Sequence, residues 1–143
     1  MEERPGGEGP SRAMKFCTAV NCMDGRTQLP VIEYLRRRFQ AEFVDMVTDP
    51  GVNRILAEGD EAARERIFAR CDISVEKHGS VGIAVAGHHD CAGNPVGEEA
   101  QLEHIRRAVE ALRGRYPELE VIGLWVDGER RVREVAGAGR PSQ

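Results

Sequence analysis

The sequence has no long apolar run, no excess of positive charge and no apolar stretch at its start. None of its segments approaches the roughly 20 consecutive apolar residues that a membrane-spanning helix needs. The net charge of −4 at pH 7 argues against a nucleic-acid partner, because binding to phosphates calls for a basic surface. The opening residues include Glu2, Glu3 and Glu8 and lack the apolar core of a secretory signal. We therefore expect a cytoplasmic protein that binds neither membranes nor nucleic acid.

The spacing of the cysteines argues against one kind of chemistry. The chain has four cysteines and no Cys-x-x-Cys pair, which argues against a thiol redox protein. Without an export signal, these cysteines are expected to be thiols or metal ligands and not disulfide partners. Cys17 and Cys71 fall on predicted buried faces and are interpreted as small core residues. Cys22 and Cys91 are left as candidates for chemistry.

The size and composition predict one domain. A chain of 143 residues with 41% apolar and 31% charged residues is long enough for a single core and too apolar for disorder. Residues 1–13 are rich in Gly, Pro and Glu and are predicted to be a flexible leader. Residues 14–136 are predicted to form the domain, and residues 137–143 a flexible tail. No internal repeat is visible.

Short apolar runs bounded by turn residues predict up to five strands. They cover residues 15–21, 43–48, 81–86, 120–126 and 131–135. The first strand is apolar on both faces, as in the buried strands of parallel sheets. After the second strand, Asp49-Pro50-Gly51 predicts a tight turn in which the glycine takes a positive φ. Asp127-Gly128 leads into the last segment, which is expected to pair back as a short hairpin.

Helical periodicities separate these strands. A short helical piece is expected before Glu58, and Asp60 and Gly79 are the predicted N-cap and C-terminal stop of a long helix. A helix in the region of residues 102–112 is expected to end at Gly114 and Pro117. The predicted buried stripes are Leu29, Ile32, Leu35 and Phe39 in the first helix, Ala63, Ile67, Cys71 and Val75 in the long helix, and Leu102, Ile105, Val109 and Leu112 in the last.

Alternating strands and helices predict an α/β fold. We expect a three-layer α/β/α arrangement with a mostly parallel central sheet of about four to five strands and right-handed crossovers. Ligands of such sheets bind beyond the carboxyl ends of the strands, at the point where the strand order reverses. If the strands at 15–21 and 81–86 are neighbours there, the residues that follow them come together in space.

Two motifs follow these two strands. Cys22-x-Asp24-x-Arg26 offers a thiolate, a carboxylate and a guanidinium, and His88-x-x-Cys91 offers an imidazole and a thiolate. Zinc binds thiolate and imidazole, and a Cys₂His set leaves a fourth tetrahedral position for water or substrate. Each motif alone is weak evidence. The two in this order predict one metal site, to which each motif contributes part of the ligands.

Together the motifs resemble the zinc site of the β-class carbonic anhydrases. Residues 73–81 and 121–128 are similar to that family in order and spacing, so the resemblance covers most of the chain. It implies that Cys22, His88 and Cys91 bind Zn²⁺, and that Asp24, paired with Arg26, orients the zinc-bound hydroxide. The implied activity is that of a zinc lyase that reversibly hydrates carbon dioxide to bicarbonate.

Several alternatives stay open at this level. The same hydroxide could hydrolyse a related small molecule such as carbonyl sulfide, or the protein could be a non-catalytic zinc binder in which Asp24 fills the fourth position. His89 and Asp90 are candidates for proton transfer, although side chains in tight loops more often bond the backbone. The remaining histidines, His78 and His104, are interpreted as helix-surface residues.

The sequence departs from the resembled family at three places. Ala92 follows the second cysteine where the family has glycine, and residues 47–51 replace a pocket-lining Arg-x-Ala-Gly segment. The chain also lacks the long helical arm through which larger members dimerise. We nevertheless expect a reduced homodimer, because a sheet edge and an apolar pocket mouth would otherwise face water.

Overall fold

The computed structural model describes residues 14–137. Within this range the chain forms a five-stranded sheet with the order β2-β1-β3-β4-β5, in which the first four strands are parallel and β5 is antiparallel to β4. The predicted leader and residues 138–143 of the predicted tail lie outside the described residues. The strands are β1 (Phe16–Asn21), β2 (Phe43–Thr48), β3 (Gly82–His88), β4 (Glu120–Val126) and β5 (Val132–Ala136).

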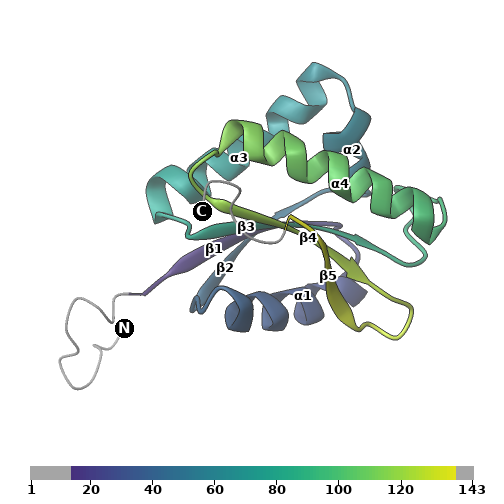
Figure 1. Cartoon of the computed structure of the whole chain (residues 1–143), viewed down its shortest axis with the longest axis horizontal. Coiled ribbons are helices and arrows are strands. Elements are labelled where there is room, and N and C mark those ends of the chain that lie inside the picture. Colours follow the sequence, from purple (N-terminus) through teal and green to yellow (C-terminus); the bar gives the residue numbers. More distant parts are fainter. Residues whose placement is uncertain (1–13, 138–143) are drawn as a thin grey trace.

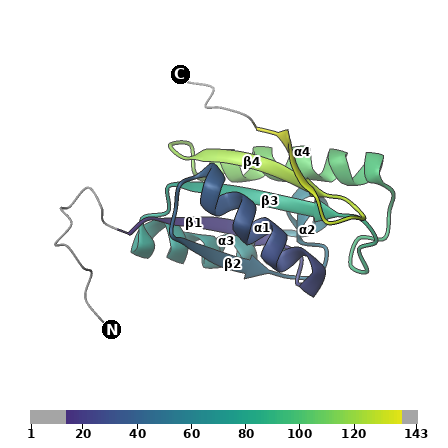
Figure 2. The same cartoon turned by 90° about the horizontal axis from the view of Figure 1, so that it is seen from below.

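Helices cover both faces of the sheet, which confirms the predicted α/β class and its three layers. One face carries α1 alone, and the other carries α2, α3 and α4 (Figures 1 and 2). No helix in residues 14–137 is long and apolar enough to cross a membrane. The helices are α1 (Gly25–Arg38), α2 (Val52–Glu58), α3 (Glu61–His78) and α4 (Glu98–Arg115).

The strand order reverses between β1 and β3. The chain runs from β1 out to the edge strand β2 and then crosses back to place β3 on the other side of β1. Thr18 pairs with Ile83 and Val20 with Val85, so the two strands run in register toward the same end of the sheet. All of β3 is buried, as expected for a central parallel strand covered on both faces. The ends of β1 and β3 therefore lie together, as predicted.

The predicted ends of α3 are confirmed in detail. The side chain of Asp60 accepts a hydrogen bond from the backbone N–H of Ala63, which satisfies one of the unpaired donors of the first turn. Gly79 ends the helix in the left-handed region with φ 64°. Ile67 and Cys71 are buried as expected, and Cys17 is fully buried in β1.

The buried stripe of α1 matches the predicted one only in part: Leu35 and Phe39 are buried as expected. Leu29 was expected to face the core, but its side chain is 66% exposed. The buried positions are Thr27, Val31 and Leu35, which repeat at i+4 and therefore share one face. Leu29 lies two residues from Thr27 and Val31, about half a turn away from that face. The helix begins at Gly25, directly after its N-cap Asp24.

Candidate metal centre

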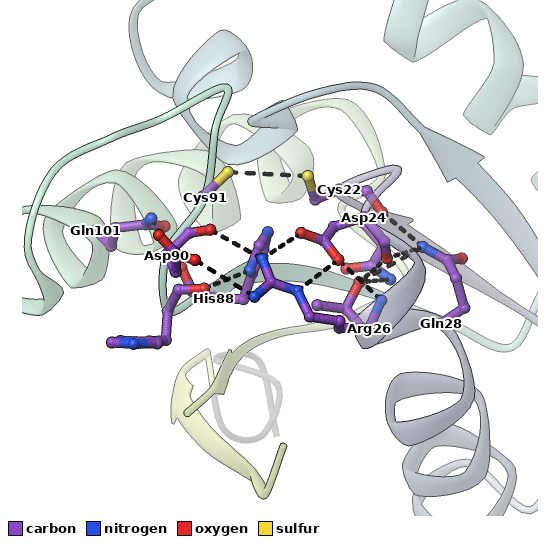
Figure 3. A network of polar contacts seen from close by, with 11 residues as sticks. Cys22, Asp24, Arg26, Gln28, His88, Asp90, Cys91 and Gln101 are labelled. Atoms are coloured by element: carbon purple, nitrogen blue, oxygen red, sulfur yellow. Dashed lines mark hydrogen bonds and ion pairs between the residues drawn. The ribbon is translucent and has the colours of Figure 1, made fainter. Parts of the chain in front are cut away.

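Three buried side chains meet where β1 and β3 end. Cys22 follows β1, His88 is the last residue of β3, and Cys91 lies in the loop between β3 and α4. Their residues are 5%, 3% and 4% exposed. One ligand atom from each lies within 4.8 Å of the other two. The structure therefore brings together the three predicted metal ligands (Figure 3).

The separation of the two sulfur atoms fits a shared metal ion. Sγ of Cys22 and Sγ of Cys91 are 3.8 Å apart, far more than the roughly 2.05 Å of a disulfide bond. Two thiolates each about 2.3 Å from one zinc ion at the tetrahedral angle would be about 3.8 Å apart. The pair is thus spaced for a common tetrahedral ion.

The imidazole of His88 is held as a metal-binding histidine is. Its Nδ1 donates to the backbone carbonyl of His89 at 2.8 Å, which fixes the ring and its tautomer. Its Nε2 is buried, and no group of the described chain hydrogen-bonds to it. A buried nitrogen without a hydrogen-bond partner is costly unless a bound group satisfies it. A metal ion beside the two sulfurs would do so.

The electrostatics of the two thiols also call for a cation. Burial raises the pKa of Cys22, but the adjacent His88 imidazole and the backbone of Gly51 and Asp24 outweigh it and lower the pKa to about 7. Burial and the neighbouring Cys22 raise the pKa of Cys91. Two thiolates this close repel each other, so both ionise readily only with positive charge between them. The donor set therefore fits Zn²⁺.

Asp24 is hydrogen-bonded to Arg26, and these bonds disfavour a role as a metal ligand. Nη2 of Arg26 donates to Oδ2 of Asp24 at 2.7 Å, and Nε donates to Oδ1 at 3.0 Å. The Arg26 side chain and backbone hold the pKa of Asp24 well below its usual range. Oδ1 also accepts from the backbone N–H of Arg26 as the N-cap of α1. The carboxylate is therefore ionised, oriented and shared between a helix start and a guanidinium.

Arg26 also reaches across to the loop after β3. It donates through Nη2 to the backbone carbonyl of Asp90 at 3.1 Å and through Nη1 to the Asp90 carboxylate at 3.4 Å. Asp90 adopts the left-handed conformation with φ 60°, which Asp tolerates better than most residues. One arginine thus joins the loop that carries Cys22 to the loop that carries Cys91.

The loop after the second cysteine makes a close backbone contact with the turn after β2. A Cβ atom at Gly93 would lie 2.5 Å from the backbone carbon of Pro50, and a Cβ at Gly51 would lie 2.5 Å from the backbone of Gly93. Gly51 has φ 59°, as its predicted turn requires. Ala92 is exposed, so its methyl group meets no such obstacle. Gly51 and Gly93 are therefore the positions at which only glycine fits without a clash.

A small pocket opens beside His88 on the α1 side of the sheet. It encloses ≈ 30 Å³, which is room for about one or two waters. Arg26 and His89 lie at this pocket, together with the turn between β4 and β5. A small molecule could reach the end of β3 here.

Some residues around the site were missed or misplaced by sequence reasoning. His104 was expected on the helix surface, but its side chain is only 13% exposed because Asn94 and Glu58 contact its two ring nitrogens. His78 is exposed as expected and pairs with Asp45 at 2.7 Å. Gln101 was not considered. It occupies the i−4 position from Ile105 on the buried stripe of α4, and a polar residue at that position was the available signal.

Comparisons with known proteins show a family and a fold. A family model described as "Putative carbonic anhydrase" matches residues 12–136. No curated protein matches the chain significantly.

Solved structures of fungal carbonic anhydrases share the fold. A carbonic anhydrase from Glaciozyma antarctica superposes with a TM-score of 0.56 at 16% identity, covering 90% of this chain and 89% of that chain. A tetrameric β-carbonic anhydrase from Sordaria macrospora gives 0.56 at 14% identity, with 87% and 81% covered. The β-carbonic anhydrase CafD of Aspergillus fumigatus gives 0.54 at 13% identity, with 91% and 95% covered. At these identities the likeness concerns the fold.

Proposed function

The chain belongs to the "Putative carbonic anhydrase" family, and from that premise we propose that it is a zinc-dependent enzyme that reversibly hydrates carbon dioxide to bicarbonate. Cys22, His88 and Cys91 would hold the zinc ion. The observation that carries the proposal is the set of two sulfurs 3.8 Å apart beside a buried, unpartnered imidazole nitrogen. Zinc bound there would supply a Lewis acid that brings the pKa of a water molecule from about 15.7 toward 7.

The proposed role of Asp24 is to orient the attacking water. Its carboxylate stays ionised throughout the neutral range because Arg26 lowers its pKa, so it accepts hydrogen bonds and does not exchange protons there. A carboxylate fixed by three hydrogen bonds from Arg26 has little freedom to move. It can therefore hold one O–H of a water so that a lone pair faces a small electrophile.

The proposed role of Arg26 is to keep Asp24 in that position. A free carboxylate beside a zinc ion would compete with water for the fourth ligand position. Arg26 occupies both carboxylate oxygens and is itself anchored to Asp90. This arrangement favours the catalytic interpretation over a closed, purely structural zinc site.

The test is stopped-flow hydration of carbon dioxide by the zinc-loaded protein between about pH 7 and 9, a range that brackets the expected pKa of the activated water. We expect saturable activity that rises with pH and is abolished in Cys91→Ala. Protein with one bound zinc ion and no such activity would contradict the proposal. Carbonyl sulfide, assayed in parallel, would then show whether a related electrophile is the substrate.

We also propose that the protein acts as a homodimer. The sheet ends in the edge strand β2, where Phe43 is 41% exposed, and exposed strand edges favour pairing with another chain. The related protein from Sordaria macrospora is described as tetrameric. Light scattering after size-exclusion chromatography would report the mass, and a monomer at micromolar concentration would contradict the proposal.

A further inference from the structure

Two buried amide side chains lie directly beneath the loop that carries Cys91. Asn53 on α2 is 1% exposed, and Gln101 on α4 is fully buried. Nδ2 of Asn53 donates to Oε1 of Gln101 at 2.9 Å. Buried amides are costly unless their polar atoms are paired, and this bond orients the Gln101 amide so that its N–H groups face the loop.

Gln101 donates both of its N–H groups to the loop. Nε2 lies 3.0 Å from the carbonyl oxygen of His88 and 3.1 Å from that of Asn94. These two carbonyls precede and follow Cys91, so one side chain fixes both ends of the segment between them. The first belongs to a proposed ligand residue itself, and holding it sets the direction in which the imidazole leaves β3.

The end of β3 is shaped to receive these amides. A Cβ atom at Gly87 would lie 2.6 Å from Oε1 of Gln101 and 2.8 Å from Nδ2 of Asn53. Any larger residue at this position would push the amide pair away from the strand. The absence of a side chain at Gly87 therefore gives the pair access to the backbone beside His88.

A second connection between the same two helices holds the far end of the loop. Nδ2 of Asn94 donates to Nδ1 of His104 at 3.0 Å, which places the ring proton on Nε2, facing Glu58 at 3.2 Å. Asn94 is fully buried. The loop is thus fastened to α2 and α4 at two points, and Gln101 is the one that reaches a proposed ligand.

We propose that Gln101, oriented by Asn53, is a positioning residue for metal binding, which holds the segment 88–94 so that His88 and Cys91 reach ligating distance of Cys22. This inference rests on the proposed function. The buried stripe of α4 would otherwise favour an apolar residue at this position, since Ile105 and Val109 continue it. A fully paired amide there is explained by the loop that it fixes.

The test compares Gln101→Met with a control on the same helix. Methionine has a similar length and shape to glutamine but no N–H group to donate. Val109→Ala also removes buried contacts from α4. The Val109 side chain packs beside Gly123 of β4 and Gly137, which follows β5, and not at the loop. Zinc affinity is measured by competition with a chromophoric chelator, and the absorption spectrum of the Co²⁺-loaded protein reports the ligand geometry.

We expect Gln101→Met to bind zinc about 10- to 100-fold more weakly than the unmodified protein and to change the Co²⁺ spectrum. Val109→Ala should change neither. Equal zinc affinity and identical spectra for Gln101→Met and the unmodified protein would overturn the inference.

A readout without metal separates this inference from the proposed function. In the zinc-free protein, alkylation of Cys91 by iodoacetamide, followed by mass spectrometry, should be several-fold faster in Gln101→Met than in Val109→Ala, because the loop is released. Failure of the unmodified protein to bind zinc would contradict the proposed function. The alkylation rates would still test whether Gln101 positions the loop. Equal alkylation rates would count against it.

Discussion

Arg26 donates hydrogen bonds to both carboxylate oxygens of Asp24. Its Nη2 also donates to the backbone carbonyl of Asp90 on the neighbouring loop. The same carboxylate caps α1. One side chain therefore has a structural role as an N-cap and a proposed catalytic role as an orienting group, and suitable substitutions can separate the two.

Asp24→Asn removes the charge but keeps a good N-cap residue, whereas Asp24→Ala removes both. We expect both variants to lose about 100-fold or more in kcat/KM for carbon dioxide hydration, since correct orientation of the reacting water is lost in each. Only Asp24→Ala should also lose about 1 kcal/mol of stability in urea unfolding. Full activity in Asp24→Asn would rule out a role for the charge.

Zinc affinity is expected to rise with pH. The metal-free Cys22 thiol has its pKa lowered to about 7, and the pKa of Cys91 is raised by burial and by Cys22. Protons therefore compete with the metal in the neutral range, and each thiol that must deprotonate weakens binding by up to about tenfold for each pH unit below its pKa. Chelator competition between pH 6 and pH 9 would measure the slope, and a flat profile would argue against thiolate ligation.

Gly93→Ala and Ala92→Gly form a matched pair. The first places a methyl group against the backbone of Pro50, so we expect a loss of about 1 to 3 kcal/mol in stability from overpacking and weaker zinc binding. The second acts at an exposed position and should leave zinc affinity within about twofold, since surface changes usually cost less than about 0.5 kcal/mol. Thermal unfolding and chelator titration would check both. Equal behaviour of the two variants would contradict the close contact between the loops.

Arg38 joins α1 to the strands β4 and β5 by ion pairs. It contacts Glu120 of β4 at 2.6 Å and Glu134 of β5 at 3.0 Å, and all three side chains are no more than 27% exposed. Arg38→Met should cost about 1 to 2 kcal/mol, because it removes the guanidinium from two partly buried carboxylates and leaves Glu134 with only the hydroxyl of Tyr34. Arg37→Met, at an exposed position of the same helix, is the control and should cost less than about 0.5 kcal/mol in urea unfolding.

Asp72 makes part of the free energy of unfolding depend on pH in the acidic range. Its hydrogen bonds with Arg115 lower its pKa, burial opposes this, and the hydroxyl of Tyr116 lowers it further. The contribution is fully present above the unfolded pKa of about 3.9 and is lost as the pH falls through the lower folded value. Asp72→Asn should therefore destabilise the protein at pH 7 and flatten the decline of stability below about pH 4. An unchanged acid limb in urea titrations would contradict this.

The sequence by itself determined the order of the elements and the proposed ligands. Buried strands and helical stripes have local periods, and Asp60 and Gly79 act through local hydrogen bonds and backbone conformation, so their positions are visible in the chain. The cysteine and histidine motifs could be identified because each follows a recognisable strand.

Only the tertiary structure decided which side chains surround that site. Leu29 points outward and Thr27 inward because the face of α1 that carries Val31 and Leu35 packs on the sheet, and local periodicity alone does not say which face does so. The bond between Gln101 and the loop joins residues from α4 and β3 that approach only once α2 and α4 pack together. Such contacts depend on the relative placement of whole elements, whereas the ligand motifs depend on a few adjacent residues.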